Sequence, residues 1–233
     1  MQRHLISSLF LTAFLASLAS AETRTWRFDD LKPGAIPAQW KTMSAWSSAG
    51  RPIEGDCPAH ATFEAVGIAG PSGAAQGNQA LKLTRKSDAI YDDGHHCWTK
   101  EVNFTNGTIS ADVRAEDTAK GHCGLAFRIQ DHKNYYAVRY SIVQGDLALV
   151  RVKNGQAVWD KAAKVSTGDA KGAKKWFNLK VEVTGNTIVA SIDGKPLLRY
   201  TDADPLTAAG GIGLFSRGNE SVVLWDNLTV ATN

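Results

Sequence analysis

The side chains of this chain with the most reactive chemistry gather around its three cysteines. Cys57, Cys97 and Cys123 each have a histidine within three residues, in the runs CPAH, HHC and HC. Thiolates and imidazoles are ligands that Zn²⁺ and Cu accept, so one interpretation is a metal site assembled from distant parts of the chain. The residues available to such a site are His60, His95, His96, Cys97, His122 and Cys123.

The same cysteines also allow a disulfide, which is the first expectation in an exported protein. A Cys57–Cys97 bridge would fasten an irregular stretch to a strand, whereas Cys97–Cys123 would join the starts of two strands. Either pairing leaves an odd thiol. The sequence does not choose between a disulfide, a metal site and three inert thiols, because none of the spacings matches a recognised ligand motif.

Arginines and one tyrosine form a second group, whose chemistry is that of binding. Apolar and polar residues alternate along three segments between residues 107 and 143, and alternate side chains of a strand point to opposite faces. The alternation sends Arg114, Arg128 and Arg139 to the face away from the core. If the three strands are neighbours, the arginines share one surface with the other polar residues of that face, which are Asp112, Gln130 and Tyr135.

Such a surface suits a carbohydrate, because sugar rings stack on aromatic rings and guanidinium groups bind hydroxyls or carboxylates with two hydrogen bonds. It suits an acidic glycan, such as a uronate or sulfated polymer, better than a neutral one. The alternative is a solvated face whose arginines pair with acids. We expect Trp98 and Trp159, near strand ends, to form stacking platforms, and Trp176 and Trp225 to lie in the core.

The carboxylates are not arranged for glycoside hydrolysis, which needs two acids across the scissile bond. Glu101 and Glu182 stand alone on predicted strands. A lyase needs a base, such as a histidine or tyrosine, and an arginine that neutralises a uronate carboxylate. Tyr135, Arg128 and Arg139, together with a histidine, would meet that need.

Calcium is a separate expectation, because Ca²⁺ takes oxygen ligands from Asp and Asn at loop edges. Asp226 and Asn227 near the end of the chain, or Asp30 near its start, could supply them as a structural site. The alternative is that Asp226, which follows a core tryptophan, satisfies backbone groups at a bulge.

Short strands are the elements that must position these residues, because runs of alternating polarity recur between turn residues. Asn154-Gly155 and Asp193-Gly194 are hairpin signals, and residues 44–79 form an irregular excursion. Along one strand the pattern places Leu125, Phe127 and Ile129 in the core. The predicted strands span 80–85, 100–104, 107–114, 124–130, 135–143, 147–153, 157–161, 176–184, 187–192, 196–201, 211–216 and 221–230.

This pattern predicts a single all-β domain over residues 22–233, built as a two-sheet antiparallel jelly-roll sandwich. The runs GLAFRIQDHKNYYAVRY, WFNLKVEVTGNTIVASIDGKPLLRYTD, GGIGLFSRG and LWDNLTV resemble the concanavalin A-like lectin/glucanase superfamily. They are most similar to its LamG-like and 3-keto-disaccharide hydrolase (domain of unknown function 1080) branches. The opening WRFDDLKPGAIPAQWK is similar to their first strand and the loop beside it.

The resemblance covers most of the chain after residue 21. It implies a concanavalin A-like fold in which the concave, non-core face of one sheet holds sugar. Laminarinase-type hydrolases of this superfamily carry Glu-x-Asp-x-Glu on one strand, and this sequence lacks that run. The resemblance to the 3-keto-disaccharide hydrolases assigns no catalytic residue in this sequence.

Residues 1–21 have the layout of a secretory signal peptide. Arg3 and His4 precede an apolar run over 5–18, and Ala19-Ser20-Ala21 is a small-x-small cleavage site. The run is too short for a membrane span with these flanks. Of the 26 Lys and Arg only Arg3 lies here, so 25 remain against 23 Asp and Glu. This balance argues against a nucleic-acid partner.

We therefore predict a secreted or periplasmic module, with no membrane span, that binds an oligo- or polysaccharide. One alternative is a glycan-degrading enzyme on the same fold, either a 3-keto-glycoside hydrolase or a polysaccharide lyase. Another is an exported protein whose Cys/His cluster handles a metal.

Overall fold

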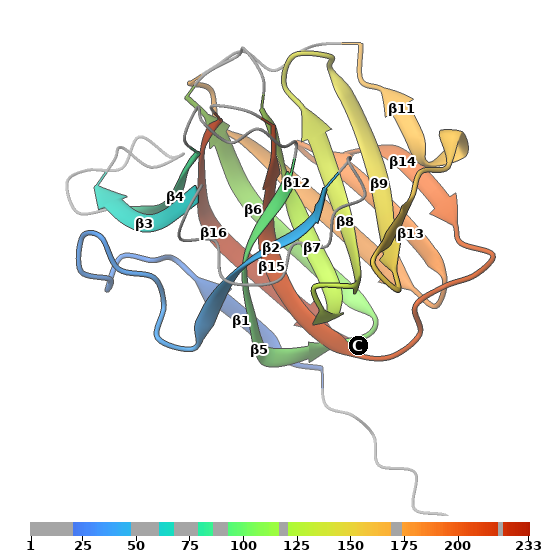
Figure 1. The fold of residues 1–233 in the computed structure, drawn as a ribbon, viewed down its shortest axis with the longest axis horizontal. Helices are drawn as coiled ribbons and strands as arrows, with labels where there is room; N and C mark the ends of the chain where they lie inside the picture. Colours follow the sequence, from blue (N-terminus) through green and yellow to red (C-terminus); the bar gives the residue numbers. More distant parts are fainter. Residues whose placement is uncertain are drawn as a thin grey trace, which may run out of the picture.

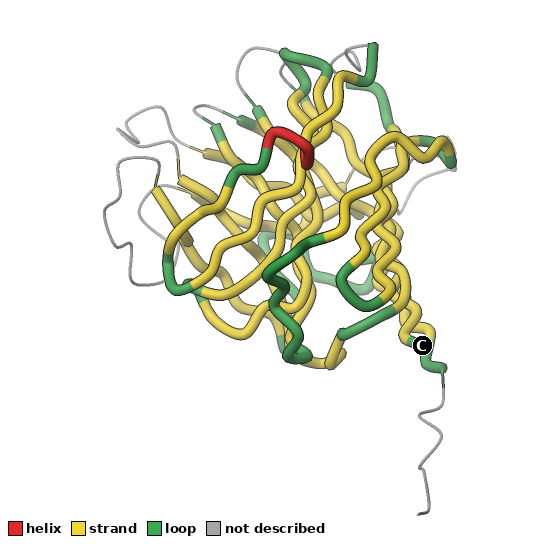
Figure 2. The backbone as a smooth tube through the Cα atoms, turned by 90° about the vertical axis from the view of Figure 1, so that its right-hand side faces the viewer, coloured by secondary structure: helices red, strands yellow, loops and turns green. Residues whose placement is uncertain are grey.

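The computed structural model describes residues 21–47, 61–67, 79–85, 93–116, 121–168, 174–218 and 221–233 of the 233-residue chain. These residues form two antiparallel sheets packed against each other (Figure 1). Figure 2 shows that strands make up most of the described chain. The one helical element in this part is the 3₁₀ turn η1 (Lys161–Ala163).

Sheet A holds the first strand and the last. In order across the sheet its strands are β14 (Lys195–Thr201), β13 (Thr187–Ile192), β12 (Phe177–Thr184), β6 (Gly107–Ala115), β16 (Val222–Thr232), β4 (Gln79–Arg85) and β3 (Ala61–Gly67), and β1 (Thr23–Trp26) lies beside β16.

Sheet B holds most of the residues that the sequence singles out for binding. In order its strands are β10 (Gln156–Val158), β9 (Asp146–Lys153), β8 (Asn134–Ser141), β7 (His122–Asp131), β15 (Gly210–Arg217), β5 (Asp93–Phe104) and β2 (Trp40–Ser47), and β11 (Lys164–Ser166) lies beside β9.

The main core lies between the sheets. Every second residue of β6 is buried, and its apolar residues Ile109, Ala111 and Val113 pack with the inward side chains of β12. Trp225 of β16 is fully buried and donates a hydrogen bond from Nε1 to the carbonyl oxygen of Gly124 on sheet B, at 3.2 Å. Large buried apolar side chains contribute about 1.5–3 kcal/mol each to stability, so this layer holds the two sheets together.

Tight turns set the register of the hairpins. Asp193 and Gly194 have φ of 50° and 77°, and Asn154 and Gly155 have φ of 53° and 77°. Two successive residues with positive φ form the type I′ turn, which matches the twist of the flanking strands. Both predicted hairpins are therefore confirmed.

The predicted two-sheet sandwich is confirmed, and all twelve predicted strands are present, eleven of them with shifted ends. One shift matters for function, because β5 begins at Asp93 and not at residue 100, so the GHHCWTK run is part of a strand. The excursion predicted over 44–79 is wrong in part, since it contains the end of β2 and all of β3. Residues 48–60 and 68–78 lie outside the described residues.

Candidate functional site

The outer face of sheet B, the side turned away from sheet A, carries the candidate site. One row of paired residues crosses five strands: His96 on β5, Phe215 on β15, Gly124 on β7, Arg139 on β8 and Ala148 on β9. Directly paired residues present their side chains on the same face. A second apolar cluster lies on this face, made of Met43, Ala126, Ile129, Tyr135, Ala137, Val150, Val152 and Phe215.

A tryptophan and two arginines meet beside this apolar cluster. The guanidinium carbons of Arg139 and Arg217 each lie 5.3 Å from the ring centroid of Trp159. Arg139 also donates from Nη1 to Oδ1 of Asp146 at 3.2 Å, and Lys164 Nζ lies 2.8 Å from Oδ2 of the same carboxylate. We call Trp159, Arg139, Arg217 and Asp146 the Trp159 cluster. Asp146 is therefore a buried carboxylate held by two cations.

The centre of the face is aromatic and neutral. The ring centroid of His96 lies 4.6 Å from that of Tyr135 and 5.0 Å from that of Phe215. Burial, together with the charge of His95, lowers the pKa of His96 to about 3, so its ring is neutral at pH 7. Burial raises the pKa of Tyr135 above its ordinary value, and Arg217 partly opposes this. Among the described residues neither ring nitrogen of His96 has a hydrogen-bond partner.

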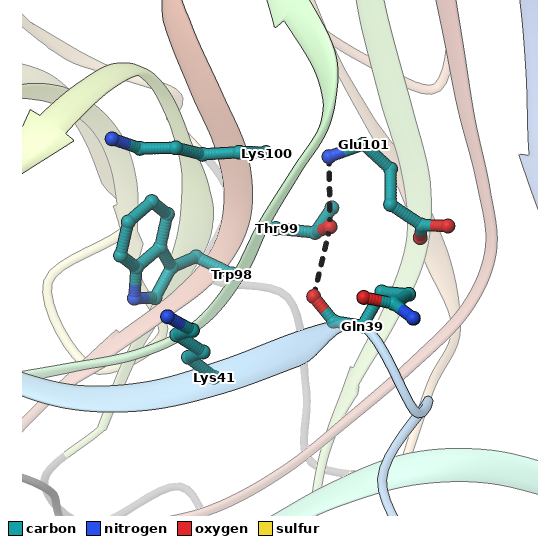
Figure 3. Close-up of a pocket in the computed structure, with 6 residues that line it drawn as sticks. All are labelled: Gln39, Lys41, Trp98, Thr99, Lys100 and Glu101. Atoms are coloured by element: carbon teal, nitrogen blue, oxygen red, sulfur yellow. Dashed lines mark hydrogen bonds between the residues drawn. The ribbon is translucent and has the colours of Figure 1, made fainter.

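A pocket of about 380 Å³ lies toward the β2 edge of the same sheet (Figure 3). Lys41 and Trp98 are paired across β2 and β5, and Trp98 is paired with Gly213, so both side chains belong to the outer face. We call it the Trp98 pocket, and its lining residues are Gln39, Lys41, Trp98, Thr99, Lys100 and Glu101.

The prediction that three arginines share one surface is wrong for Arg114. This residue lies on β6 in sheet A, because β6 pairs with β12 and β16 and not with β7. Its Nε donates to Glu116 at 2.6 Å, and its guanidinium carbon lies 5.2 Å from the ring centroid of Trp176. Trp176 is therefore only half-buried, against Arg114, whereas Trp225 is in the core as predicted.

The placement of Arg128 on the binding face is also wrong. Its φ of 49° marks a bulge in β7, and its buried guanidinium donates four hydrogen bonds of 2.6–3.0 Å to the carbonyl oxygens of Thr105, Gly185 and Leu206. Four of its five N–H donors are therefore engaged in the fold. The bulge also reverses the alternation of side chains along β7. Ile129 was predicted in the core, but it lies on the outer face. The alternation therefore no longer predicts which face carries the half-buried side chain of Gln130.

The cysteines and histidines that the structure describes do not form one cluster. Cys97 and Cys123 are buried in the core between the sheets, whereas His96, which precedes Cys97, lies on the outer face. His95 turns the other way, with Nδ1 3.2 Å from the hydroxyl of Ser44. Among the described residues no group of three His, Cys, Asp or Glu is placed to hold a metal.

The Cys97–Cys123 disulfide, one of the two pairings that the sequence left open, is not formed. Cys123 is a free thiol in the core, and burial raises its pKa above the ordinary value. His122, beside it, lies at the start of β7, paired with Arg217 of β15. Cys57 and His60 lie outside the described residues.

The expected calcium ligand Asp226 lies at a bulge. Its Oδ1 accepts a hydrogen bond from the backbone N–H of Asn227 at 2.7 Å, and Asn227 has a φ of 50°. Burial raises the pKa of Asp226 to about 6, and the charges of Asp29 and Asp112 act in the same direction. The backbone role considered from the sequence is therefore present, and calcium binding, including at Asp30, stays a prediction.

The sequence of this chain matches a known protein family over most of its length. A family model described as the 3-keto-alpha-glucoside-1,2-lyase-like domain matches residues 34–231. The chain belongs to this family. The match confirms the family branch that the sequence resembles, and a comparison with curated proteins finds no match.

Solved structures confirm the concanavalin A-like jelly-roll fold, and at these identities they show the fold alone. A β-glucanase of Bacillus licheniformis is 12% identical over 91% of this chain and 98% of its own, with a TM-score of 0.56. A structure described under endo-acting O-glycanases of the human gut microbiota is 15% identical over 90% and 98%, with a TM-score of 0.56. A Bacillus subtilis protein with a galectin-like fold is 15% identical over 83% and 90%, with a TM-score of 0.54.

In this 3-keto-alpha-glucoside-1,2-lyase-like domain, the matched residues include the whole Trp159 cluster and the whole Trp98 pocket. The sequence analysis missed Arg217 and Asp146 of the Trp159 cluster, as well as Lys41 and Lys100 of the Trp98 pocket. Arg217 was missed because the predicted strand ended at residue 216. Its position two residues after Phe215 was the available signal, since alternation places both on one face. Within the described residues, no helix has the length and apolar character needed to cross a membrane.

Proposed function

We propose that this domain binds a carbohydrate on the outer face of sheet B, at the Trp159 cluster. The observation that carries the proposal is a tryptophan side chain, 41% exposed, with two guanidinium groups 5.3 Å from its ring centroid. The apolar face of a sugar stacks on such a ring, and the arginine forks donate to its hydroxyl or carboxylate oxygens.

We further propose that the preferred glycan is acidic. Among the described residues the cluster and its neighbour Lys164 bring together three cationic groups, Arg139, Arg217 and Lys164, beside the carboxylate of Asp146. A uronate carboxylate or a sulfate ester suits such groups, because arginine binds both with paired hydrogen bonds. The signal-like residues 1–21 support a protein that meets its glycan in the periplasm or outside the cell.

The test is affinity electrophoresis and calorimetry across a panel of neutral, uronate and sulfated polysaccharides. Trp159→Ala should weaken binding about tenfold or more, because stacking and both arginine contacts are lost together. Val158→Ala is the matched control, since Val158 is an equally exposed apolar neighbour. Equal affinity in the parent and in Trp159→Ala for every ligand would show that the cluster is not the binding surface.

An enzyme that eliminates a 3-keto sugar is the second candidate function, and the family match favours it. In this reaction a base removes the C2 proton, which the C3 carbonyl acidifies. The electrons of that bond form a C1–C2 double bond while the C1–O bond breaks, and the leaving oxygen takes a proton. Tyr135, His96 and Arg217 lie together on the outer face for such chemistry.

Incubation with a 3-keto disaccharide, followed by ultraviolet absorbance of the conjugated enone, tests this second candidate. Turnover that falls at least tenfold in Arg217→Ala would support the enzyme and contradict a module without catalysis. The absence of enone, with binding retained, would support the module. Unsaturated-uronate assays on polyuronates test the polysaccharide lyase in the same way.

A further inference from the structure

The Trp98 pocket has the composition of a binding site for a charged ring. The Nζ of Lys100 lies 5.6 Å from the ring centroid of Trp98, and Figure 3 shows the indole between the side chains of Lys100 and Lys41. The Nε1 of Trp98 is buried, and no hydrogen-bond acceptor among the described residues reaches it. A ligand in the pocket therefore meets the half-buried indole ring and the two ammonium groups, and not the Nε1 donor.

The charge of the pocket is positive. Glu101 is the one carboxylate among the lining residues, and Arg24 neutralises it through a contact of 2.6 Å between Nη2 and Oε1. Neither Lys41 nor Lys100 has a carboxylate within ion-pair distance among the described residues. Two ammonium groups therefore flank one aromatic ring, and no carboxylate in the described part of the chain pairs with either of them.

The β2–β5 edge holds the pocket in shape. The hydroxyl of Thr99 donates to the carbonyl oxygen of Gln39 at 3.2 Å, and the N–H of Glu101 donates to that same hydroxyl at 3.1 Å. These bonds, which Figure 3 shows as dashed lines, fix the two strands that carry the lysines. A volume of about 380 Å³ falls in the range of small-molecule sites and holds a group the size of a monosaccharide.

We propose that the Trp98 pocket is a subsite for an anionic sugar unit, a carboxylated or sulfated ring. The ring stacks on Trp98, and its anionic group lies between Lys41 and Lys100. This site is separate from the Trp159 cluster, and the proposal does not depend on that cluster.

The two sites lie on one face, which suits an extended acidic chain. Trp98 on β5 is in register with Gly213, Ala126 and Ala137 on β15, β7 and β8. Three strand spacings separate Trp98 from the strand that carries Arg139, which is about 14 Å. The residues between them in this row have small side chains, so the row itself presents no bulky group to a ligand.

The experiment compares oligogalacturonate with the same oligomer after carboxyl reduction, which keeps the ring and removes the charge. We expect the parent to bind the charged oligomer about tenfold more tightly by calorimetry, because two charge-assisted contacts are gained. Lys41→Ala/Lys100→Ala should lose that preference and keep the parent's affinity for the reduced oligomer. Lys195→Ala, which removes an exposed charge on β14 of sheet A, should keep the preference.

Equal binding of the two oligomers by the parent, or a preference that survives in the double variant, would overturn the proposal. A third titration, with a sulfated chondroitin, tests whether the subsite binds sulfate as well as carboxylate. If it does, the parent should bind this polymer more tightly than the Lys41→Ala/Lys100→Ala variant does. Trp159→Ala in the same titrations separates the two sites. If Trp159→Ala binds like the parent while the double variant loses its preference, the proposal for the Trp159 cluster is contradicted and that for the Trp98 subsite is supported. If Trp159→Ala binds weakly while the double variant keeps the preference, the Trp98 subsite is contradicted and the Trp159 cluster is supported.

Discussion

Arg128 shows, at the scale of a single residue, how a charged side chain serves the fold. Its guanidinium joins three turns at one end of the sandwich through the carbonyl oxygens of Thr105, Gly185 and Leu206. These oxygens would be left without their donor if the side chain were shortened. Hydrogen bonds to charged groups contribute about 1.5–3 kcal/mol each, with part of this offset by the cost of burying the charge.

Arg128→Met should therefore lower the free energy of unfolding by about 3 kcal/mol, measured by urea denaturation. Arg114→Met is the control, because Arg114 makes a partly exposed ion pair with Glu116, and its loss should cost less than about 1 kcal/mol. Similar losses in the two variants would contradict the structural role of Arg128.

His96 predicts a second effect at this scale, in the pH dependence of stability. Its folded pKa of about 3 lies below the ordinary 6.5, so the unfolded chain binds a proton more readily than the folded one. Stability contributed by the neutral ring is complete above pH 6.5 and is lost as the pH falls toward 3. Between pH 7 and pH 5 this loss amounts to roughly 2 kcal/mol.

His96→Phe should reduce that loss, because phenylalanine keeps the aromatic contacts with Tyr135 and Phe215 and cannot take a proton. The measurement is urea denaturation at pH 7 and at pH 5 for the parent and the variant. An equal difference between the two pH values in both proteins would show that His96 does not titrate in this way.

At the scale of elements, the packing of β15 against β5 positions the Trp98 pocket. A Cβ on Gly213 would lie 2.7 Å from Cβ of Trp98 and 2.8 Å from the carbonyl oxygen of Cys97. Both atoms belong to a strand fixed on two sides, so the strand must move to admit a methyl group.

Gly213→Ala should cost about 1–3 kcal/mol in stability and should weaken the preference for the charged oligomer, because Trp98 is displaced. Gly67→Ala is the matched control, since apart from its two neighbours in the chain no residue has an atom within 4 Å of the added Cβ. Thermal unfolding and the two-oligomer titration provide the measurements. Parent-like behaviour of Gly213→Ala in both would show that the pocket does not depend on this contact.

The limits of periodicity are also clearest in the strands. The run from His95 to Cys97 has no alternating polarity because all three side chains are buried, on both faces of the strand, and so the start of β5 was missed. The bulge at Arg128 was missed for a different reason, since a positive φ at a non-glycine residue has no pattern in the sequence. In a strand such as β6, with one face in the core and the other polar, the alternation was sufficient to predict the strand and its buried face.

The whole molecule is a sandwich in which consecutive strands often belong to different sheets. β6 and β7 follow each other in the chain, yet one lies in sheet A and the other in sheet B (Figure 1). The turns and the alternation predicted two sheets, but strand order depends on pairings between distant residues that local patterns do not carry. Tyr135 and Arg139 were therefore placed on one face correctly, and Arg114 was not.

The central claim, that glycan binds the outer face of sheet B, is tested most directly by the indole N–H signals of the protein in solution. Titration with an acidic oligosaccharide should shift the signal of Trp159, and that of Trp98 where the second subsite is filled. The signals of Trp225, in the core, and of Trp176, on the outer face of sheet A, should stay unchanged. A shift at Trp176 with none at Trp159 would contradict the account.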